Sequence, residues 1–210
     1  MKKKGILVVV SGFAGTGKGT LMKRLLSDYD NYALSVSMTT RKPRPGEVNG
    51  REYFFVSNEE FEKTIKEDGL VEYAGYCDHY YGTPRAYVEE QLNAGKDVIL
   101  EIEIQGALKI KEKFPDSFLV FVLPPSAAEL KARLVGRATE TPEVIEQRLN
   151  RAVEESKGIE KYDCIALNDD IDECTKRLHA AIMSAHWTTD RNIDFIEKIR
   201  TELEALPKGE

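Results

Sequence analysis

The sequence predicts an α/β protein: a parallel sheet core flanked by helices, with a smaller mixed-β lobe inserted into it. An apolar, β-branched run over residues 6–10 precedes a glycine-rich turn and a segment of helical composition over 21–26. Strand-like and helical segments alternate at both ends of the chain, as in a doubly wound parallel sheet. Between about residues 37 and 90, short strand-like runs cluster instead. This change of rhythm predicts the inserted lobe.

The first strand, turn and helix carry the spacing of a phosphate-binding loop. Gly12, Gly17 and Lys18 form the pattern Gly-x-x-x-x-Gly-Lys. Glycines let several backbone N–H groups face one anion, and the following helix N-terminus adds its positive dipole end. The spacing alone is not specific and also fits a surface turn. The strand before it and the helix after it favour a nucleotide loop of the P-loop NTPase type. Gly19 stands where the strict motif has Ser or Thr, so the hydroxyl expected at magnesium falls to Thr20.

The predicted lobe contains short strands and one helix. Ser57 and Glu60 have the spacing of a capping box, as do Ser126 and Glu129 later in the chain, and Gly95 is a candidate for the residue that ends a helix in the left-handed conformation. Thr83-Pro84 is expected to cap the start of the helix that ends at Gly95. The expected order is a strand over 32–38, a proline-containing basic loop over 39–47, a strand over 51–56, a helix from 57 to near Gly69, and strands over 70–76 and 79–82.

The second half returns to the alternating pattern. We expect strands over 96–102, 117–122 and 163–168, and helices over 106–113, 130–135, 142–157 and from 172 to the end. The predicted division is a core over 1–36 and 91–210, with a helical lid at about 127–158, and the inserted lobe over 37–90.

Composition restricts the class of partner. The chain has 30 basic and 36 acidic residues, a net charge of −6, which argues against nucleic-acid binding through bulk charge. No apolar run has the length of a membrane span, and the basic start does not lead into a secretory signal. The three cysteines, odd in number and without metal-ligand spacing, indicate free thiols in a reducing compartment. We therefore expect a cytoplasmic protein whose phosphate ligands are held by local arginine clusters.

Two arginine groups are candidates for binding phosphate. Arg41 and Arg44 lie on a segment stiffened by prolines, and guanidinium groups match phosphate oxygens in pairs. Arg133, Arg137 and Arg148 flank the break between two predicted helices, where they can close over a phosphoryl group. Solvated surface charge is the alternative for both groups.

Acidic and aromatic residues supply further candidates. Glu101 and Glu103 follow a buried strand, at the sheet edge where α/β proteins bind ligands. A water-mediated magnesium contact is the functional interpretation, and an ion pair with a core base is the alternative. The tyrosines of the lobe either form its core or contact a base and a phosphate. The three histidines have no metal-ligand spacing and are expected to be structural.

Taken together, these residues resemble the guanylate kinase family over almost the whole chain, from about residue 5 to 186. The most specific segment runs from residue 37 to 50, Ser-Met-Thr-Thr-Arg-Lys-Pro-Arg-Pro-Gly-Glu-Val-Asn-Gly, and is followed by Tyr53-Phe54-Phe55. Segments that agree in order and spacing follow at 80–83, 100–106, 123–126, 133–137 and 168–169.

The resemblance implies magnesium-dependent transfer of the ATP γ-phosphoryl group to GMP, and to dGMP, giving ADP and GDP. A carboxylate that accepts from the guanine N1–H and amine discriminates against adenine. The implied GMP site is Ser37, Arg41, Arg44, Glu47, Tyr53, Glu72, Tyr81, Thr83 and Glu103. The implied ATP site is Gly12, Phe13, Ala14, Gly15, Thr16, Gly17, Lys18, Gly19, Thr20 and Asn168, the last of these near the adenine. The implied catalytic residues are Lys18, Arg41, Arg133, Arg137 and Arg148, with Thr20 and Glu101 toward magnesium.

The chain departs from the family pattern at three places. Phe13-Ala14 replaces the usual Pro-Ser, Glu101 and Glu103 replace an aspartate pair, and Ala138 stands where glycine is frequent. None of these changes removes a charge that the chemistry requires.

Two other functions remain open from the sequence. A guanylate-kinase-like protein-interaction module would have lost the ATP loop, whereas Gly12, Gly17 and Lys18 are intact. A kinase with another base preference has no use for Ser37 with Glu72. Monomer and homodimer are both compatible with the sequence.

Overall fold

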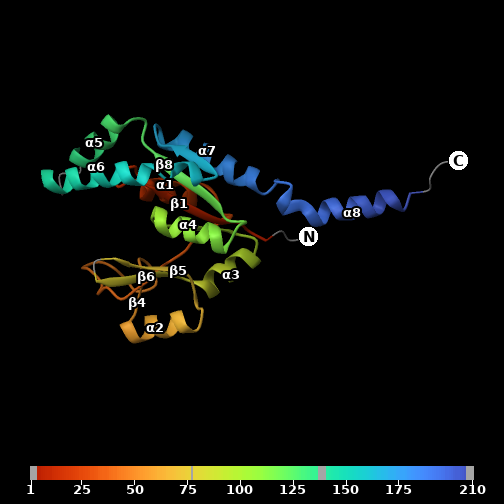
Figure 1. The fold of residues 1–210 in the computed structure, drawn as a ribbon, viewed down its shortest axis with the longest axis horizontal. Helices are drawn as coiled ribbons and strands as arrows, with labels where there is room; N and C mark the ends of the chain where they lie inside the picture. Colours follow the sequence, from red (N-terminus) through yellow and green to blue (C-terminus); the bar gives the residue numbers. More distant parts are fainter. Residues whose placement is uncertain (1–3, 77, 137–140, 207–210) are drawn as a thin grey trace.

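The computed structural model describes residues 4–76, 78–136 and 141–206. It contains a five-stranded sheet of order β2-β7-β1-β8-β9 and a four-stranded sheet of order β4-β3-β6-β5 (Figure 1). Every pair in the larger sheet is parallel, whereas the smaller sheet mixes parallel and antiparallel pairs. The predicted α/β class, with a parallel core and a second mixed sheet, is confirmed.

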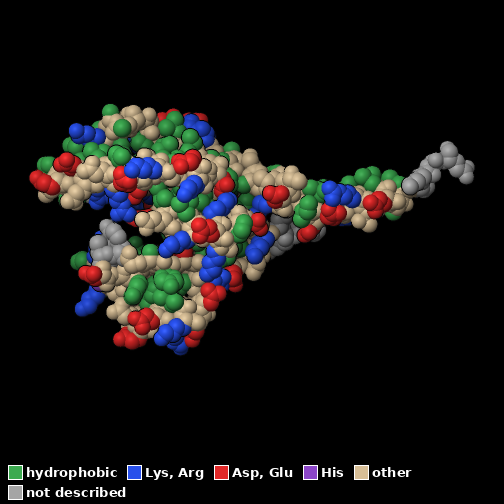
Figure 2. All heavy atoms as spheres, viewed as in Figure 1, with side chains coloured by type: hydrophobic (Ala, Val, Ile, Leu, Met, Phe, Trp, Pro, Cys, Tyr) green, Lys and Arg blue, Asp and Glu red, His purple; other side chains and the backbone are tan. Residues whose placement is uncertain are grey.

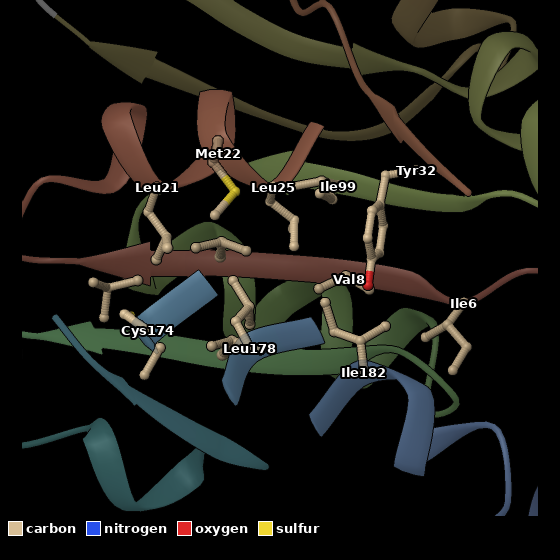
Figure 3. Close-up of a cluster of buried hydrophobic side chains, with 14 of the residues drawn as sticks. Ile6, Val8, Leu21, Met22, Leu25, Tyr32, Ile99, Cys174, Leu178 and Ile182 are labelled. Atoms are coloured by element: carbon tan, nitrogen blue, oxygen red, sulfur yellow. The ribbon is translucent and has the colours of Figure 1, made fainter. Parts of the chain in front are cut away.

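The three central strands of the larger sheet are buried on both faces, as their apolar sequences require. Its strands are β1 (Leu7–Gly12), β2 (Tyr32–Leu34), β7 (Asp97–Glu101), β8 (Phe118–Leu123) and β9 (Cys164–Leu167). Helices α1 (Lys18–Asp28) and α7 (Ile171–Ala185) cover one face, where Leu25 and Leu178 pack against Val8 (Figure 3). Helices α3 (Arg85–Asn93) and α4 (Ile104–Lys113) cover the other face.

The smaller sheet shows where the predicted strands were wrong. It consists of β3 (Met38–Thr39), β4 (Phe54–Phe55), β5 (Leu70–Tyr76) and β6 (His79–Pro84), beside α2 (Asn58–Lys66). The single strand expected over 32–38 is in fact two, since β2 pairs with β7 in the larger sheet and β3 with β4 and β6 in the smaller one. The strand expected over 51–56 is reduced to β4.

Several predicted helix ends are confirmed. The hydroxyls of Ser57 and Ser126 accept from the backbone N–H groups of Glu60 and Glu129. Gly95 ends α3 with φ +87°, and its N–H donates to Leu92 O at 3.0 Å.

Two other expected ends differ from the structure. At the end of α2, Asp68 takes the left-handed conformation with φ +51°, one residue before the expected Gly69. Thr83 does not cap α3, because its hydroxyl donates to the carboxylate of Glu72 instead.

Helix α5 (Ala127–Gly136) and α6 (Pro142–Ser156) precede a short 3-10 turn (Ile159–Lys161), β9 and α7. A second 3-10 turn (Asp190–Asn192) then separates α7 from α8 (Ile193–Glu204). From α7 onward the chain forms two helices, α7 and α8, where one was expected. Helix α8 extends away from the body and has no buried residue, and most of its apolar side chains are exposed (Figures 1 and 2). No helix within the described ranges is long and apolar enough to cross a membrane.

Candidate active site

The loop between β1 and α1 has the backbone that the phosphate-binding motif predicts. Gly12, Gly15 and Gly17 have φ values of +155°, +91° and +86°, which side chains disfavour. A Cβ atom at Gly12 would lie 2.5 Å from the carbonyl oxygen of Val122, and one at Gly17 would lie 2.7 Å from Nδ2 of Asn168. Glycine is therefore required at these positions for conformation and for space.

Lys18 is turned toward its own loop. Its Nζ donates to the carbonyl oxygens of Gly12 and, at 3.2 Å, of Phe13. The ammonium group is therefore hydrogen-bonded within the loop itself and does not reach another element through these two bonds.

Two side chains from other elements brace the same loop. The buried Asn168 donates its amide to Thr16 O at 2.7 Å. Arg133 of α5 donates to Asn168 O at 3.0 Å and pairs with Glu129 at 2.8 Å. The amide of Asn168 is thus committed to supporting the loop, and its expected contact with adenine stays a prediction.

The remaining ATP candidates differ in their surroundings. The Phe13 ring is buried against Phe121 at a centroid distance of 5.1 Å, so this residue offers its backbone and not its side chain. Gly19 and Thr20 are exposed on the first turn of α1. No atom lies within 4 Å of the place that a Cβ at Gly19 would take.

A cleft of about 700 Å³ brings many of the candidates together. The molecule is indented between the part that carries α5 and α6 and the part that carries the smaller sheet (Figure 2). The candidates that line the cleft are Gly12, Ala14, Lys18, Ser37, Tyr53, Glu101, Glu103 and Arg148. The cleft therefore joins the phosphate loop to α6 and to Ser37 and Tyr53, which lie just before β3 and β4 of the small sheet.

Glu101 lies at the carboxyl end of β7, opposite Val10 of the neighbouring β1. Although its carboxylate reaches solvent in the cleft, the surrounding protein raises its pKa, and the charge of Lys18 opposes that shift. An acidic group therefore faces the ammonium group beside the phosphate loop.

The basic loop is ordered by a bidentate ion pair, which the sequence analysis did not foresee. Both Nη atoms of Arg41 donate to the Glu47 carboxylate at 2.9 Å, and Arg44 N donates to the same carboxylate at 2.7 Å. The guanidinium holds the pKa of Glu47 below its ordinary range. The carbon of the guanidinium lies 5.3 Å from the centre of the Tyr53 ring, which contacts Tyr81 at 5.8 Å. Arg41, Glu47, Tyr53 and Tyr81 thus form one cluster.

Glu72 and Thr83 form a second cluster in the small sheet. The Thr83 hydroxyl is buried and donates to Glu72 Oε1 at 2.7 Å. Burial raises the pKa of Glu72, which the hydrogen bond from Thr83 and the charge of Lys109 partly offset.

Two of the remaining candidates are Glu103 and Arg137. Glu103 forms an ion pair with Arg151 of α6, and Arg137 lies outside the described residues. Arg151 and Ser35, neither of which was predicted from the sequence, also line the cleft. The buried Ser35 hydroxyl has no hydrogen-bond partner among the described residues. The sequence signal that could have pointed to Ser35 is its place two residues before Ser37.

The histidines of α7 and its end have structural contacts, as expected. His179 stacks on Tyr29 at 3.7 Å and hydrogen-bonds the Tyr32 hydroxyl, while His186 Nε2 lies 2.9 Å from Asp97. The described part of the chain contains no group of three His, Cys, Asp or Glu residues arranged to hold a metal ion.

A glycine loop at the carboxyl end of the central parallel strand, with a lysine and arginines around one cleft, defines a P-loop nucleotide-binding enzyme of the phosphoryl-transfer class. Comparison with known proteins narrows the class. The family model described as guanylate kinase matches residues 4–185. The chain belongs to the guanylate kinase family, whose reaction is the phosphorylation of GMP by ATP.

The curated relatives agree over nearly their full length. A guanylate kinase of Caldanaerobacter subterraneus is 48% identical over 96% of this chain and 98% of its own. One of Halalkalibacterium halodurans is 49% identical over 92% and 95%. The crystal structure of guanylate kinase from Anaplasma phagocytophilum has 32% identity and a TM-score of 0.71, and the match covers 90% of each chain. At this identity and coverage, the chain is an enzyme of this family and not a binding module that has lost the activity.

Proposed function

We propose that the chain transfers the γ-phosphoryl group of ATP to GMP, and to dGMP, across the 700 Å³ cleft. The observation that carries the proposal is that Lys18 lines one side of this cleft while Ser37 and Tyr53 line the other. In this proposal, residues 1–36 and 91–210 form the ATP-binding core, about 127–158 its lid, and 37–90 the GMP-binding lobe.

The two clusters of the small sheet suit the two ends of GMP. Arg41, Arg44, Tyr53 and Tyr81 would bind the phosphate, with Glu47 holding Arg41 in a fixed orientation beforehand. Ser37, Glu72 and Thr83 would bind the guanine, with Glu103 nearby. Because Thr83 donates to one oxygen of Glu72, the hydroxyl orients a carboxylate that has further lone pairs for the guanine N1–H and amine.

The donor nucleotide would lie on the loop from Gly12 to Thr20. Its backbone N–H groups and Lys18 would hold the phosphates, with Asn168 supporting the loop from beneath. Arg133 and Arg148, together with Arg137, would neutralise the charge that develops on the transferred group. Phosphoryl transfer depends on positioning and charge neutralisation, so the scheme needs no histidine base.

The residues of the cleft fit magnesium, which prefers one or two carboxylates together with water and phosphate oxygens. Glu101 provides such a carboxylate beside Lys18, and its reach favours contact through water. Thr20 is the nearest hydroxyl after Lys18 in the sequence, because Gly19 has none. When bound, the ion would neutralise charge on the β- and γ-phosphates.

The nucleotide substrates and the free thiols favour a cytoplasmic enzyme. It would act as a monomer or homodimer, without a nucleic-acid or membrane partner.

The base-reading role of Glu72 is tested by Glu72→Gln. The amide cannot accept two hydrogen bonds from guanine in the same way, so we expect the preference for GMP over AMP in kcat/KM to fall about 100-fold or more. The control is Glu67→Gln, an exposed carboxylate of the same lobe. An unchanged preference in the Glu72 variant would refute the assignment.

A further inference from the structure

One face of α6 forms a wall of the cleft. The residues of α6 that line it recur at helical spacing and are Val144, Gln147, Arg148, Arg151 and Glu155. The adjacent face carries Ile145, Leu149 and Ala152, which pack in the cluster around Phe121 and Leu134. Apolar packing thus fixes α6 from one side, while the side toward the cleft depends on polar contacts.

Two of the polar contacts on that face are made by Arg151. Its Nη2 pairs with the carboxylate of Glu103, and its Nε donates to Glu155 at 2.8 Å on the next turn of the same helix. The bond to Glu155 stays within α6, whereas the bond to Glu103 joins the helix to another element.

Glu103 is placed to receive this contact. It lies two residues after Glu101, at the N-cap of α4, but its side chain makes no capping hydrogen bond with that helix. The carboxylate reaches α6 instead. The ion pair therefore connects the end of β7, where Glu101 lies, to the helix that carries Arg148.

We propose that Arg151 is a positioning residue, whose ion pair with Glu103 tethers the cleft face of α6, and with it Arg148, to the end of β7. The inference rests on the proposed function, in which Arg148 neutralises the transferred phosphoryl group. Arg151 itself contacts neither nucleotide in this scheme. Its removal is therefore expected to change kcat and leave both KM values near those of the unmodified enzyme.

The size of the expected change in kcat follows from the solvent exposure of the two side chains. The side chains of Arg151 and Glu103 are 47% and 65% exposed, so water and salt screen the pair. We expect a loss in kcat of about two- to five-fold for Arg151→Gln, in the range of exposed ion pairs.

The test is a double-mutant cycle on the full chain with Arg151→Gln, Glu103→Gln and the double variant. Lys157→Gln is the matched control, because it breaks the exposed pair with Glu154 at the end of the same helix. We expect the double variant to have the kcat of Glu103→Gln alone. Glu103→Gln is expected in addition to raise the KM for GMP, and Lys157→Gln to change neither constant. The reversed pair, Arg151→Glu with Glu103→Arg, should recover kcat relative to Arg151→Glu alone.

A second readout does not depend on activity. In the nucleotide-free protein, Arg151→Gln should speed amide hydrogen exchange in α6, while Lys157→Gln should not. Additive effects on kcat, or unchanged exchange in α6, would overturn the inference. Absence of GMP phosphorylation by the unmodified chain would instead refute the proposed function, and the exchange experiment would still decide on the ion pair.

Discussion

Glu72 and Glu101 share one physical property, a carboxyl pKa that the surrounding protein raises by displacing water, but their neighbours differ. Glu72 accepts a hydrogen bond from Thr83, whereas Glu101 faces the charge of Lys18. Perturbed carboxylates in a cleft are typical of functional sites. In the proposed scheme, the difference assigns Glu72 to reading the base and Glu101 to the side of the phosphates.

The raised pKa of Glu72 predicts how GMP binding depends on pH. Guanine donates hydrogen bonds, so it requires the ionised carboxylate, and that form is lost as the pH falls through the raised pKa. GMP affinity, measured by calorimetry without ATP or magnesium, should therefore decline at a pH above the ordinary glutamate value of 4.5. Glu72→Gln should remove this decline. A decline that persists unchanged in the variant would assign it to another group.

Gly19 offers a direct test of the magnesium assignment. A side chain fits there, since no atom lies within 4 Å of the Cβ position, and serine is also the better helix former. We expect Gly19→Ser to lower the magnesium concentration required for half-maximal rate and to stabilise the fold by up to about 0.5 kcal/mol. Gly19→Ala is the control, since it adds stability without a hydroxyl. Equal magnesium requirements in the two variants would contradict the prediction.

At the scale of elements, local signals predicted local structure. The phosphate loop, the hydroxyl caps at Ser57 and Ser126 and the end of α3 at Gly95 each depend on residues a few positions apart. The sequence could not show that residues 32–38 divide between two sheets, because an alternating pattern does not specify the pairing partner.

The same limit applies to the candidate site. Asn168 meets Thr16 across 152 residues, and Arg151 meets Glu103 across 48. Such contacts depend on how elements pack and leave no mark in local spacing. The family resemblance named Asn168 as a site residue, but only the packed structure places its amide beneath the phosphate loop.

The support that Asn168 gives to the phosphate loop predicts an effect on ATP. Asn168→Ala removes the amide that donates to Thr16 O, so we expect the KM for ATP to rise about tenfold and the fold to lose about 1–2 kcal/mol. The KM for GMP should be unchanged, because no GMP candidate contacts this side chain in the proposed scheme. Asn192→Ala, which loses bonds to His186 O and Thr188 O elsewhere in the molecule, is the control. An unaltered KM for ATP would contradict this role.

At the scale of the whole molecule, the cleft separates the halves of the proposed site. The cleft has a volume of about 700 Å³ and lies between the phosphate loop, α6 and residues next to the small sheet. The reaction requires the two nucleotides to meet with water excluded. The lobe and the lid are therefore expected to move toward the core when both are bound.

This motion is measurable by small-angle scattering. A bisubstrate analogue that joins the two nucleosides through phosphates should reduce the radius of gyration, and ATP alone should reduce it less. Inorganic phosphate controls for ionic effects. Identical profiles with and without the analogue would argue against closure.

The most direct test of the account is the rate of ADP release from ATP and magnesium with GMP, dGMP, AMP, CMP and UMP offered separately to the unmodified chain. The account predicts turnover with GMP and dGMP, and rates at least about 100-fold lower in kcat/KM with the other three. Comparable turnover of AMP, or no turnover of GMP, would contradict it.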